Sequence, residues 1–387
     1  MEKNNKTLNV PNLRFPEFSG EWEKTRFENV VSLQRGSSPR PIIEYITKSS
    51  DGVNWVKIGD MPKYGRLVTS TEEKITKEGA KKSRRVNVGD LILSNSMSYG
   101  QPYIMNIDGY IHDGWFVLKN FEKSFDRDYL CNLLISPAVQ NQYRRLAAGG
   151  VVQNISSDLV NSVIISLPSI KEQQKIASVL NIIDDRIATQ RKIIEDLKKL
   201  KRAICKIVFS SPECVTRKMA DMATITMGQS PSSLSYNEDR QGLPLIQGNL
   251  DLYDGQIRPR IYTSEITQTC TKGDVILTVR APVGEIAHAQ LAACIGRGVC
   301  AISPHNSSDA ELIYQYLSYY KPTWAKLEQG STFSSINGAD IRGIEVRCPS
   351  MSKIVLLQLF DTRIQESINL LNAYSVSKCY LLSQLFI

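Results

Sequence analysis

Two stretches of the chain carry apolar residues at alternating spacings of three and four, the pattern of a helix that packs along a heptad seam. The first seam runs through residues 176–208 and the second through 360–385, and each is interrupted twice by a polar residue at places that coincide at a shift of 177. Matching seams with matching polar layers predict that the two helices pack on each other, with the polar layers setting the register. The residues expected in this packing are Ile183, Ile187, Gln190, Ile194, Leu197, Lys201, Ile204, Phe360, Ile364, Ser367, Leu371, Tyr374, Lys378 and Leu381.

The alternative is that each apolar stripe covers only its own domain, as in an ordinary amphipathic helix. A continuous helix over residues 171–209 would contain 39 residues and measure about 58 Å. A helix of that length would act as a ruler between two domains.

The segment before each helix has the pattern of short β-strands separated by turns, with some helix. In the first copy the runs 55–58, 91–93 and 115–118 predict strands, and 129–146 predicts a helix. A Leu-Pro or Cys-Pro pair then marks a break before the long helix. These signals divide the chain into an N-terminal segment 1–22, a first domain 23–168, a first long helix 169–211, a second domain 212–349 and a second long helix 350–387.

The chain repeats its glycines and prolines in the same order in both copies. Residues 36–39 (Gly-Ser-Ser-Pro) return as 228–231 (Gly-Gln-Ser-Pro), a shift of 192. Residues 88–94 (Val-Gly-Asp-Leu-Ile-Leu-Ser) return as 272–278 (Lys-Gly-Asp-Val-Ile-Leu-Thr) at 184, and the shift falls to 177 by the end of the chain. Glycine and proline fix turns, whereas the residues between them differ. The pattern predicts one duplicated frame that carries two different surfaces.

Composition narrows the class of protein. The length of 387 residues allows two domains of ordinary size, and 42% hydrophobic with 22% charged residues is typical of folded soluble proteins. The polar start, residues 1–7, lacks the apolar segment of a signal peptide, and we expect no membrane-spanning helix. The eight cysteines are scattered without a repeat, so we expect reduced thiols in a cytoplasmic protein, with no zinc.

The net charge of +8 is gathered into clusters of Lys and Arg. They lie at residues 81–85, 144–145, 198–202 and 258–260. A single cluster can be a solvated helix or loop face. Several of them in β-rich domains favour a polyanionic partner.

We find no motif for catalysis. The chain lacks a phosphate-binding loop, a nucleophile elbow and a zinc-protease helix, and it lacks the Asn/Asp-Pro-Pro-Tyr/Phe string expected of an adenine methyltransferase. The nearest approach to a nuclease carboxylate cluster is 72–74 (Glu-Glu-Lys) with Asp60 upstream, and the second copy has no counterpart. We therefore predict a chain with no catalytic residue and no metal ligand of its own.

The ordered motifs resemble the specificity (S) subunit of type I restriction-modification systems across essentially the whole chain. The resemblance rests on residues 12–22 (Asn-Leu-Arg-Phe-Pro-Glu-Phe-Ser-Gly-Glu-Trp), on the Gly-x-Ser-Pro and Gly-Asp-Leu/Val-Ile-Leu strings of each copy, and on 172–177 (Glu-Gln-Gln-Lys-Ile-Ala). The second copy departs from the pattern, because residues 349–354 (Pro-Ser-Met-Ser-Lys-Ile) lack the Glu-Gln-Gln-Lys-Ile-Ala string.

The resemblance implies an α+β fold with two target-recognition domains, each followed by a long helix, the two helices forming an antiparallel coiled coil with pseudo-twofold symmetry. It implies that each domain reads half of a bipartite, asymmetric site in double-stranded DNA. The implied partners are two methyltransferase (M) subunits and, through them, motor-nuclease (R) subunits of a phage-defence complex. S-adenosylmethionine, ATP and Mg would belong to those partners, and this chain would bind no cofactor.

Residue chemistry nominates the DNA contacts, since Arg reads guanine, Asn or Gln reads adenine, and Ser or Thr adapts to either. Turns also favour Asn and Ser for backbone reasons, and most contacts in such interfaces go to phosphates. In the first domain the candidates are Arg35, Lys57, Lys81, Lys82, Arg84, Arg85, Ser94, Asn95, Ser96, Tyr99, Gln153 and Asn154. In the second they are Gln229, Gln247, Asn249, Thr278, Arg280, Arg297, Ser334 and Ser335.

Two other classes of function remain as alternatives: a stand-alone nuclease that uses Glu72 and Lys74, and a scaffold whose two domains bind protein or glycan. A duplicated enzyme should keep its acids and bases in the shared frame, and here the frame keeps glycines and apolar residues instead. The basic clusters argue against a glycan scaffold.

Overall fold

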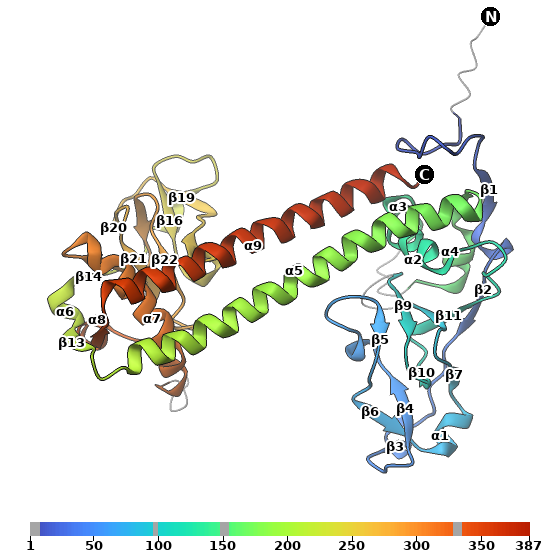
Figure 1. Cartoon of the computed structure of the whole chain (residues 1–387), viewed down its shortest axis with the longest axis horizontal. Coiled ribbons are helices and arrows are strands. Elements are labelled where there is room, and N and C mark those ends of the chain that lie inside the picture. Colours follow the sequence, from blue (N-terminus) through green and yellow to red (C-terminus); the bar gives the residue numbers. More distant parts are fainter. Residues whose placement is uncertain (1–7, 96–99, 148–154, 328–334) are drawn as a thin grey trace, which may run out of the picture. The chain divides into compact units, whose positions relative to one another are not determined.

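The computed structural model describes residues 8–95, 100–147, 155–327 and 335–387. They form two compact units: unit 1 contains residues 1–191 and 370–387, and unit 2 contains 192–369 (Figure 1). Each unit combines one β-rich domain with part of each of two long helices, α5 (Ile170–Ser210) and α9 (Met351–Gln384).

Domain 1, the β-rich part of unit 1, is built on two five-stranded sheets with the orders β3-β6-β4-β10-β7 and β2-β11-β8-β9-β5, and on the ribbon β1-β12. The pairs β4–β10 and β5–β9 are parallel. The strands are β1 (Glu23–Arg26), β2 (Ser32–Arg35), β3 (Ile46–Thr47), β4 (Val53–Val56), β5 (Leu67–Val68), β6 (Glu73–Ile75), β7 (Arg84–Val86), β8 (Leu91–Ser94), β9 (Pro102–Met105), β10 (Gly109–Ile111), β11 (Trp115–Lys119) and β12 (Ile164–Leu167). The helices are α1 (Lys77–Lys81), α2 (Arg127–Ile135), α3 (Pro137–Ala147), α4 (Ser157–Ser162) and the short 3₁₀ helices η1 (Phe27–Asn29), η2 (Ile42–Glu44) and η3 (Ile58–Asp60).

Domain 2, the β-rich part of unit 2, has sheets with the orders β15-β19-β16-β23-β20 and β14-β24-β21-β22-β18-β17, and the ribbon β13-β25. The strands are β13 (Val215–Lys218), β14 (Ala223–Met227), β15 (Tyr236–Asn237), β16 (Leu243–Ile246), β17 (Leu252–Tyr253), β18 (Gln256–Ile257), β19 (Ile261–Thr263), β20 (Gln268–Cys270), β21 (Val275–Thr278), β22 (Ile286–His288), β23 (Ala293–Ile295), β24 (Val299–Pro304) and β25 (Glu345–Cys348). The helices are α6 (Met219–Met222), α7 (Ser307–Leu327), α8 (Gly338–Arg342), η4 (Ser233–Ser235) and η5 (Asn249–Asp251).

The two domains share one topology. Strand by strand, the order β3-β6-β4-β10-β7 becomes β15-β19-β16-β23-β20, and β2-β11-β8-β9-β5 becomes β14-β24-β21-β22-β18, to which domain 2 adds β17 at the edge. The two parallel pairs recur as β16–β23 and β18–β22. The prediction of a duplicated α+β domain, followed each time by a long helix, is confirmed.

One expected helix is wrong in detail. Residues 129–146 were expected to form one helix, but the structure interrupts it at Ser136, between α2 and α3. Pro137 lacks a backbone N–H and disfavours a helical conformation of the residue before it, and Ser136 is accordingly extended, with ψ near 153°. In domain 2 the counterpart of this helix pair is the single helix α7.

The repeated Gly-x-Ser-Pro turn has a steric cause. A Cβ atom on Gly36 would lie 2.0 Å from the carbonyl oxygen of His112, and one on Gly228 would lie 2.1 Å from the carbonyl oxygen of Gly296. His112 and Gly296 are themselves equivalent at the shift of 184. The same close approach of two backbones therefore occurs in both domains, and only glycine allows it.

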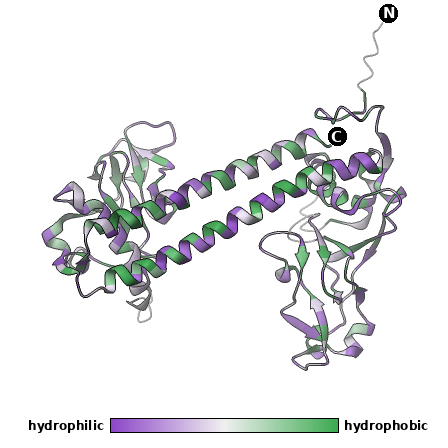
Figure 2. Ribbon diagram, viewed as in Figure 1, coloured by the Kyte–Doolittle hydropathy of each residue, from purple (hydrophilic) through white to green (hydrophobic). Residues whose placement is uncertain are grey.

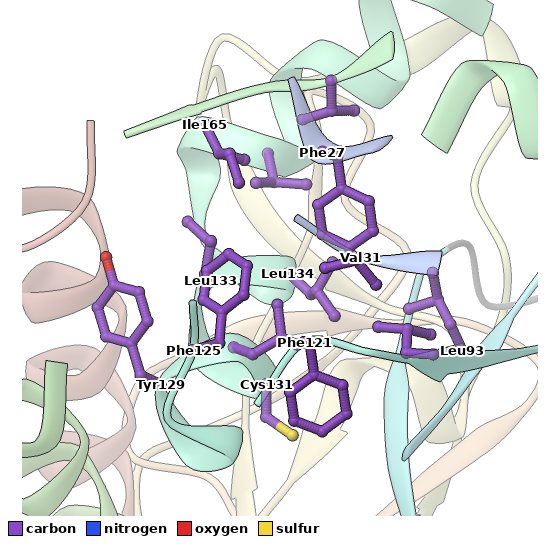
Figure 3. Packing of buried hydrophobic residues seen from close by; sticks show 14 of the residues in the cluster. Phe27, Val31, Leu93, Phe121, Phe125, Tyr129, Cys131, Leu133, Leu134 and Ile165 are labelled. Atoms are coloured by element: carbon purple, nitrogen blue, oxygen red, sulfur yellow. The ribbon is translucent and has the colours of Figure 1, made fainter. Parts of the chain in front are cut away.

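Each domain buries a core that continues onto the long helices. In unit 1, Phe27, Leu93 and Tyr129 belong to a cluster that also contains Leu180 of α5 and Phe386, just beyond the end of α9 (Figure 3). The rings of Tyr129 and Phe386 lie 5.2 Å apart. In unit 2 the corresponding cluster contains residues of both helices as well, among them Phe209 and Leu357. All eight cysteines are free thiols, as expected.

Within each unit the two helices run antiparallel. In unit 1 residues 176–180 of α5 share a core with residues 382–386, and in unit 2 residues 205–209 share one with 354–357. Apolar and polar positions alternate along both helices (Figure 2). Of the expected packing residues, five are buried (Ile187, Gln190, Ile194, Lys201 and Ile364) and the others are half-buried.

Two ion pairs link the helices at equivalent places. In unit 2, Lys201 Nζ lies 2.5 Å from Asp361 Oδ1, and in unit 1 Lys378 Nζ donates to Asp184 Oδ1. Asp184 and Asp361 are equivalent at the shift of 177, as are the two lysines. The sequence identifies the lysines as polar interruptions of the seam, and the structure adds an aspartate on the facing helix as the partner of each.

Candidate nucleic-acid interface

Loops of domain 2 bring several of the expected base readers together around one cavity. These loops follow β14, β16, β21 and β23. The cavity has a volume of about 660 Å³ and is lined by Ser230, Pro231, Ser233, Tyr236, Gln247, Gly248, Asn249, Arg280, Ala281, Arg297 and Gly298. Gln247, Asn249, Arg280 and Arg297 were all expected from the sequence, and Ser335 forms a β-bridge with Arg280 beside the cavity.

The side chain of Gln247 is held in a defined orientation. Its Nε2 donates to the Tyr236 hydroxyl at 2.9 Å, and that hydroxyl donates to the Pro231 carbonyl oxygen at 3.3 Å. Its backbone N–H donates to Asp251 Oδ2 at 2.8 Å, which fixes the turn after β16. One N–H of the amide and its oxygen are thus left to face a ligand.

The charge of the cavity lining is positive. Among its described residues are two arginines, Arg280 and Arg297, both exposed, and no Asp or Glu. The Arg297 backbone N–H donates to Ser230 Oγ at 3.1 Å, so the loop that carries the guanidinium is anchored. A cavity with this lining suits a polyanion that also presents hydrogen-bonding edges.

Domain 1 places a carboxylate where domain 2 places a guanidinium, because Asp113 is equivalent to Arg297 at the shift of 184. Ser38 Oγ donates to Asp113 Oδ1 at 2.8 Å, and Arg40 Nη2 lies 3.4 Å from Oδ2. The hydrogen bond from Ser38 is the main reason why the pKa of Asp113 lies below its usual value. Asp113 is therefore ionised at neutral pH.

The Asp113 carbonyl oxygen organises two of the expected readers of domain 1. It accepts from Asn95 Nδ2 at 2.9 Å and from Arg35 Nε at 3.3 Å. Asn95 is only 3% exposed, and its own carbonyl oxygen accepts from the Ile155 N–H. Asn95 therefore positions this loop, whereas Arg35 is exposed and available to a ligand.

Lys57 is equivalent to Gln247 but has a different environment. Its backbone N–H donates to Asp60 Oδ2, as that of Gln247 does to Asp251. Its ammonium lies 2.8 Å from Glu73, whose carboxylate raises the pKa of Lys57. The same turn therefore presents a paired cation in domain 1 and a neutral amide in domain 2.

Ser94 and Thr278 have the same structural role in the two domains. Each is buried, and its hydroxyl oxygen accepts a backbone N–H seven residues ahead, from Gln101 and from Glu285 respectively. These hydroxyl groups close the loops that follow β8 and β21. Their burial places them among the residues that shape the interface.

The basic cluster of domain 1 lies at the end of α1 and on β7. Lys81, Lys82, Arg84 and Arg85 are all exposed. Lys82 Nζ lies 4.7 Å from the centre of the Tyr45 ring, Arg84 Nε donates to the Arg35 carbonyl oxygen at 3.1 Å, and Arg85 lies 3.9 Å from Asp108. The cluster is a solvated cationic surface that continues to Arg35.

The other expected DNA-binding residues are dispersed. Gln229 is exposed beside the cavity of domain 2, and its backbone N–H donates to the Ile295 carbonyl oxygen. Ser96, Tyr99, Gln153, Asn154 and Ser334 lie outside the described residues.

The sequence did not reveal three positions of the candidate site: Asp113, Tyr236 and the serine of the Gly-x-Ser-Pro turn. The serine hydroxyl binds the residue between β10 and β11 in domain 1, and its equivalent between β23 and β24 in domain 2. The repeat itself held the signal for Asp113, since the shift of 184 pairs it with Arg297. Tyr236 had no such signal, because only the folded chain brings it to Gln247.

The residues considered for a nuclease site pair with other groups. Glu72 lies 3.9 Å from Lys57, and Lys74 Nζ donates to the Ser50 carbonyl oxygen at 3.5 Å. Within the described residues no three His, Cys, Asp or Glu side chains are placed to hold a metal ion. None of the helices in this part of the chain is both long and apolar enough to cross a membrane.

Comparison with known proteins finds relatives that are similar over almost the whole chain. The chain is 26% identical to the putative type I restriction enzyme MjaX specificity subunit from Methanocaldococcus jannaschii, with 90% of this chain and 88% of that protein covered. Its fold matches the S subunit of a type I restriction-modification system from M. genitalium, with a TM-score of 0.62, 16% identity, and 98% and 99% of the two chains covered. A structure described under complex assembly and conformational transition of the type I R-M system matches with a TM-score of 0.59 and 24% identity, over 94% of this chain and 95% of that one.

The model of one protein family matches the chain twice. The type I restriction modification DNA specificity domain covers residues 19–199 and 213–369, which contain both β-rich domains and much of both long helices. The two matches coincide with the duplication of the fold. The chain therefore belongs to the family of type I restriction modification DNA specificity domains.

Proposed function

We propose that this chain is the DNA-reading subunit of a type I restriction-modification complex and that each domain reads one half of a bipartite site. The observation that carries the proposal is the shared topology with different side chains at equivalent loop positions, such as Lys57 and Gln247, or Asp113 and Arg297. Because the loop frame is the same, both domains can present side chains to DNA in the same way. Because the side chains differ, the two half-sites differ in sequence.

The chain supplies recognition and its partners supply chemistry. Methyl transfer from S-adenosylmethionine is assigned to methyltransferase subunits, and ATP- and Mg-dependent translocation and cleavage to motor-nuclease subunits bound through them. The long helices offer a docking surface within unit 2. Ile193, Leu200 and Ile207 on α5 are spaced by seven residues and are 42%, 50% and 73% exposed, so they form one uncovered apolar stripe. On α9, Val355 and Leu359 are exposed at a spacing of four.

The proposal is tested by reconstitution. The purified chain alone should neither cut nor methylate DNA, whereas together with its partner methyltransferase subunits it should direct methylation to one bipartite sequence. Replacing Ile193, Leu200 and Ile207 by Ser should abolish methylation while DNA binding by the chain is retained, and Thr189→Ser, an exposed change on the same helix, serves as the control. Methyl transfer by the isolated chain, or methylation without sequence preference, would refute the proposal.

We further propose that the paired helices set the spacing between the half-sites. Inserting four residues after Leu200 adds about 6 Å of helix. The unspecified spacer in the methylated sequence should then grow by one or two base pairs, and both half-site sequences should stay the same. The same insertion after Glu238, in an exposed loop, should leave the spacer unchanged. An unaltered spacer in an active α5 insertion variant would remove the helices from this role.

A further inference from the structure

We infer that domain 2 reads two neighbouring base pairs through Gln247 and Arg297, an adenine through the amide and a guanine through the guanidinium. The inference rests on the proposed function and deepens it, because it assigns bases to residues of one half-site. Four observations carry it: the locked amide, the anchored arginine, their adjacency, and the absence of carboxylates from the described cavity lining.

The hydrogen bonds of Gln247 define which atoms it offers. The Tyr236 hydroxyl has a single hydrogen, and it donates that hydrogen to the Pro231 carbonyl oxygen at 3.3 Å. Its oxygen can therefore only accept from Gln247, so the group 2.9 Å away is Nε2 and the amide cannot be turned over. Nε2 retains its second hydrogen, and Oε1 faces no donor among the described residues. One donor beside one acceptor in a fixed plane matches N7 and N6 of adenine in the major groove.

Arg297 lines the same cavity as Gln247. A Cβ atom on Gly298 would lie 2.1 Å from the Gln247 carbonyl oxygen, so the Arg297 loop packs on the backbone of the turn that carries Gln247. The Ser230 hydroxyl anchors the Arg297 N–H at 3.1 Å, while the side chain is exposed and makes no ion pair with any described residue. An anchored backbone with an unpaired guanidinium suits bidentate binding to O6 and N7 of guanine. Because the loop of Arg297 packs on the turn of Gln247 and both residues line one cavity, the bases they reach should be neighbours.

The remaining chemistry of the cavity agrees with purines. The carboxylates that typically read the exocyclic amine of cytosine are absent from the described lining. Domain 1 differs at both positions, with Lys57 paired to Glu73 and with an ionised Asp113. The two neighbouring bases, one adenine and one guanine, are thus assigned to the half-site of domain 2 alone.

The test compares methylated sequences. The full-length chain is expressed with its methyltransferase in a host without other adenine methylation, and the methylated motif is sequenced for the wild type, Gln247→Ala, Gln247→Glu, Arg297→Lys and Gln241→Ala. Gln241 is exposed on a loop of the same domain and does not line the cavity, so it serves as the control. Arg297→Lys keeps the charge and removes the planar, bidentate group. Circular dichroism of each purified variant verifies that it is folded.

We expect discrimination at one A·T pair to fall about tenfold to a hundredfold in Gln247→Ala. Gln247→Glu should favour cytosine at that position, because it offers only acceptors. Arg297→Lys should relax the adjacent G·C pair in the same half-site, and Gln241→Ala should change nothing. An unchanged motif in folded Gln247 or Arg297 variants, or changes at separated positions or in different half-sites, would overturn the inference. A wild-type chain that directs no bipartite methylation would instead overturn the proposed function.

Discussion

Domain 1 and domain 2 share one backbone topology but carry side chains of different charge at equivalent loop positions. At the loop between β10 and β11, domain 1 has Asp113, held by Ser38; at the equivalent loop between β23 and β24, domain 2 has Arg297, held by Ser230. In both cases the serine comes from the Gly-x-Ser-Pro turn. In both domains the serine Oγ accepts the backbone N–H of the loop residue, at 3.4 Å from Asp113 and at 3.1 Å from Arg297, and in domain 1 it also donates to the Asp113 carboxylate. The frame therefore positions a loop and leaves its side chain free to vary.

The turns that precede β8 and β21 do not vary in this way. Each contains an aspartate that makes the same hydrogen bond in both domains. Asp90 accepts from the Asn87 N–H at 2.9 Å, and Asp274 accepts from the Thr271 N–H at 2.7 Å. These aspartates serve the fold in both copies. These repeated aspartates hold the backbone, whereas the side chains at the equivalent loop positions 113 and 297 differ between the domains.

The largest expected effect concerns the two glycines of the Gly-x-Ser-Pro turns. Gly36→Val and Gly228→Val would drive a side chain into a backbone carbonyl about 2 Å away, so each should destabilise its own unit by about 3 kcal/mol or more. Chemical denaturation measures the loss. Gly59→Ala, where a Cβ atom would meet nothing within 4 Å, should change stability little. Equal tolerance at all three positions would contradict the shared steric frame.

The interhelical ion pairs come next. Asp361→Asn leaves Lys201 without its carboxylate in a place where that side chain is 10% exposed, and we expect a loss of about 2 kcal/mol. Asp184→Asn should cost more, because the second partner of Asp184 is the cation Arg66 at 3.5 Å, whereas the second partner of Asp361 is the neutral Gln315 amide. Thermal or chemical unfolding of the two variants gives the comparison. A smaller loss for Asp184→Asn than for Asp361→Asn would contradict this ranking.

The pH dependence of stability gives a second test of the ion pair between Lys378 and Asp184 in unit 1. Burial lowers the pKa of Lys378, and Asp184 partly opposes that effect. Between the lowered pKa and the ordinary value of 10.5, the unfolded chain binds more protons than the folded one, so this group's contribution to stability rises with pH. Asp184→Asn should widen this window toward lower pH. Stability curves of variant and wild type that stay parallel from neutral to alkaline pH would contradict the assignment.

A moderate effect is expected on DNA affinity. Neutralising Lys81, Lys82, Arg84 and Arg85 together should reduce the slope of log affinity against log salt by about 0.9 for each phosphate that the variant no longer neutralises. The methylated sequence should not change, because phosphate contacts carry no base information. Binding isotherms at several salt concentrations measure the slope. An unchanged slope would show that the cluster is a solvated surface only.

The smallest effect concerns Asp113. Its pKa lies below the ordinary value of 3.8, mainly through Ser38, so its contribution to stability is present above pH 3.8 and is lost as the pH falls through the lowered value. Asp113→Asn should remove this acid-side dependence, which an acid titration of folding would record. Arg297→Gln in domain 2 should leave the acid titration unaltered.

The sequence predicts the turns and the long helices well, because both require particular residue types at particular spacings. Repeated glycines and prolines mark the turns, and the heptad seams mark the helices. The aspartate partners of Lys201 and Lys378 are less readable, since a helical pattern does not reveal which residue of the facing helix lies opposite. Two residues of the site could not be assigned from the sequence. Asn95 was expected to contact DNA, but it is buried and supports a loop. Tyr236 was not expected to matter, but in the folded chain it accepts a hydrogen bond from Gln247.

The central claim, two independent readers on one frame, is tested most directly by an exchange of residues 23–165 for the equivalent segment of a relative with a different target. The methylated sequence of the chimaera is then determined in the presence of the partner methyltransferase. One half-site should change to that of the relative, while the other half-site and the spacer stay as they were. A chimaera that is folded and active but changes both halves, or neither, would contradict the account.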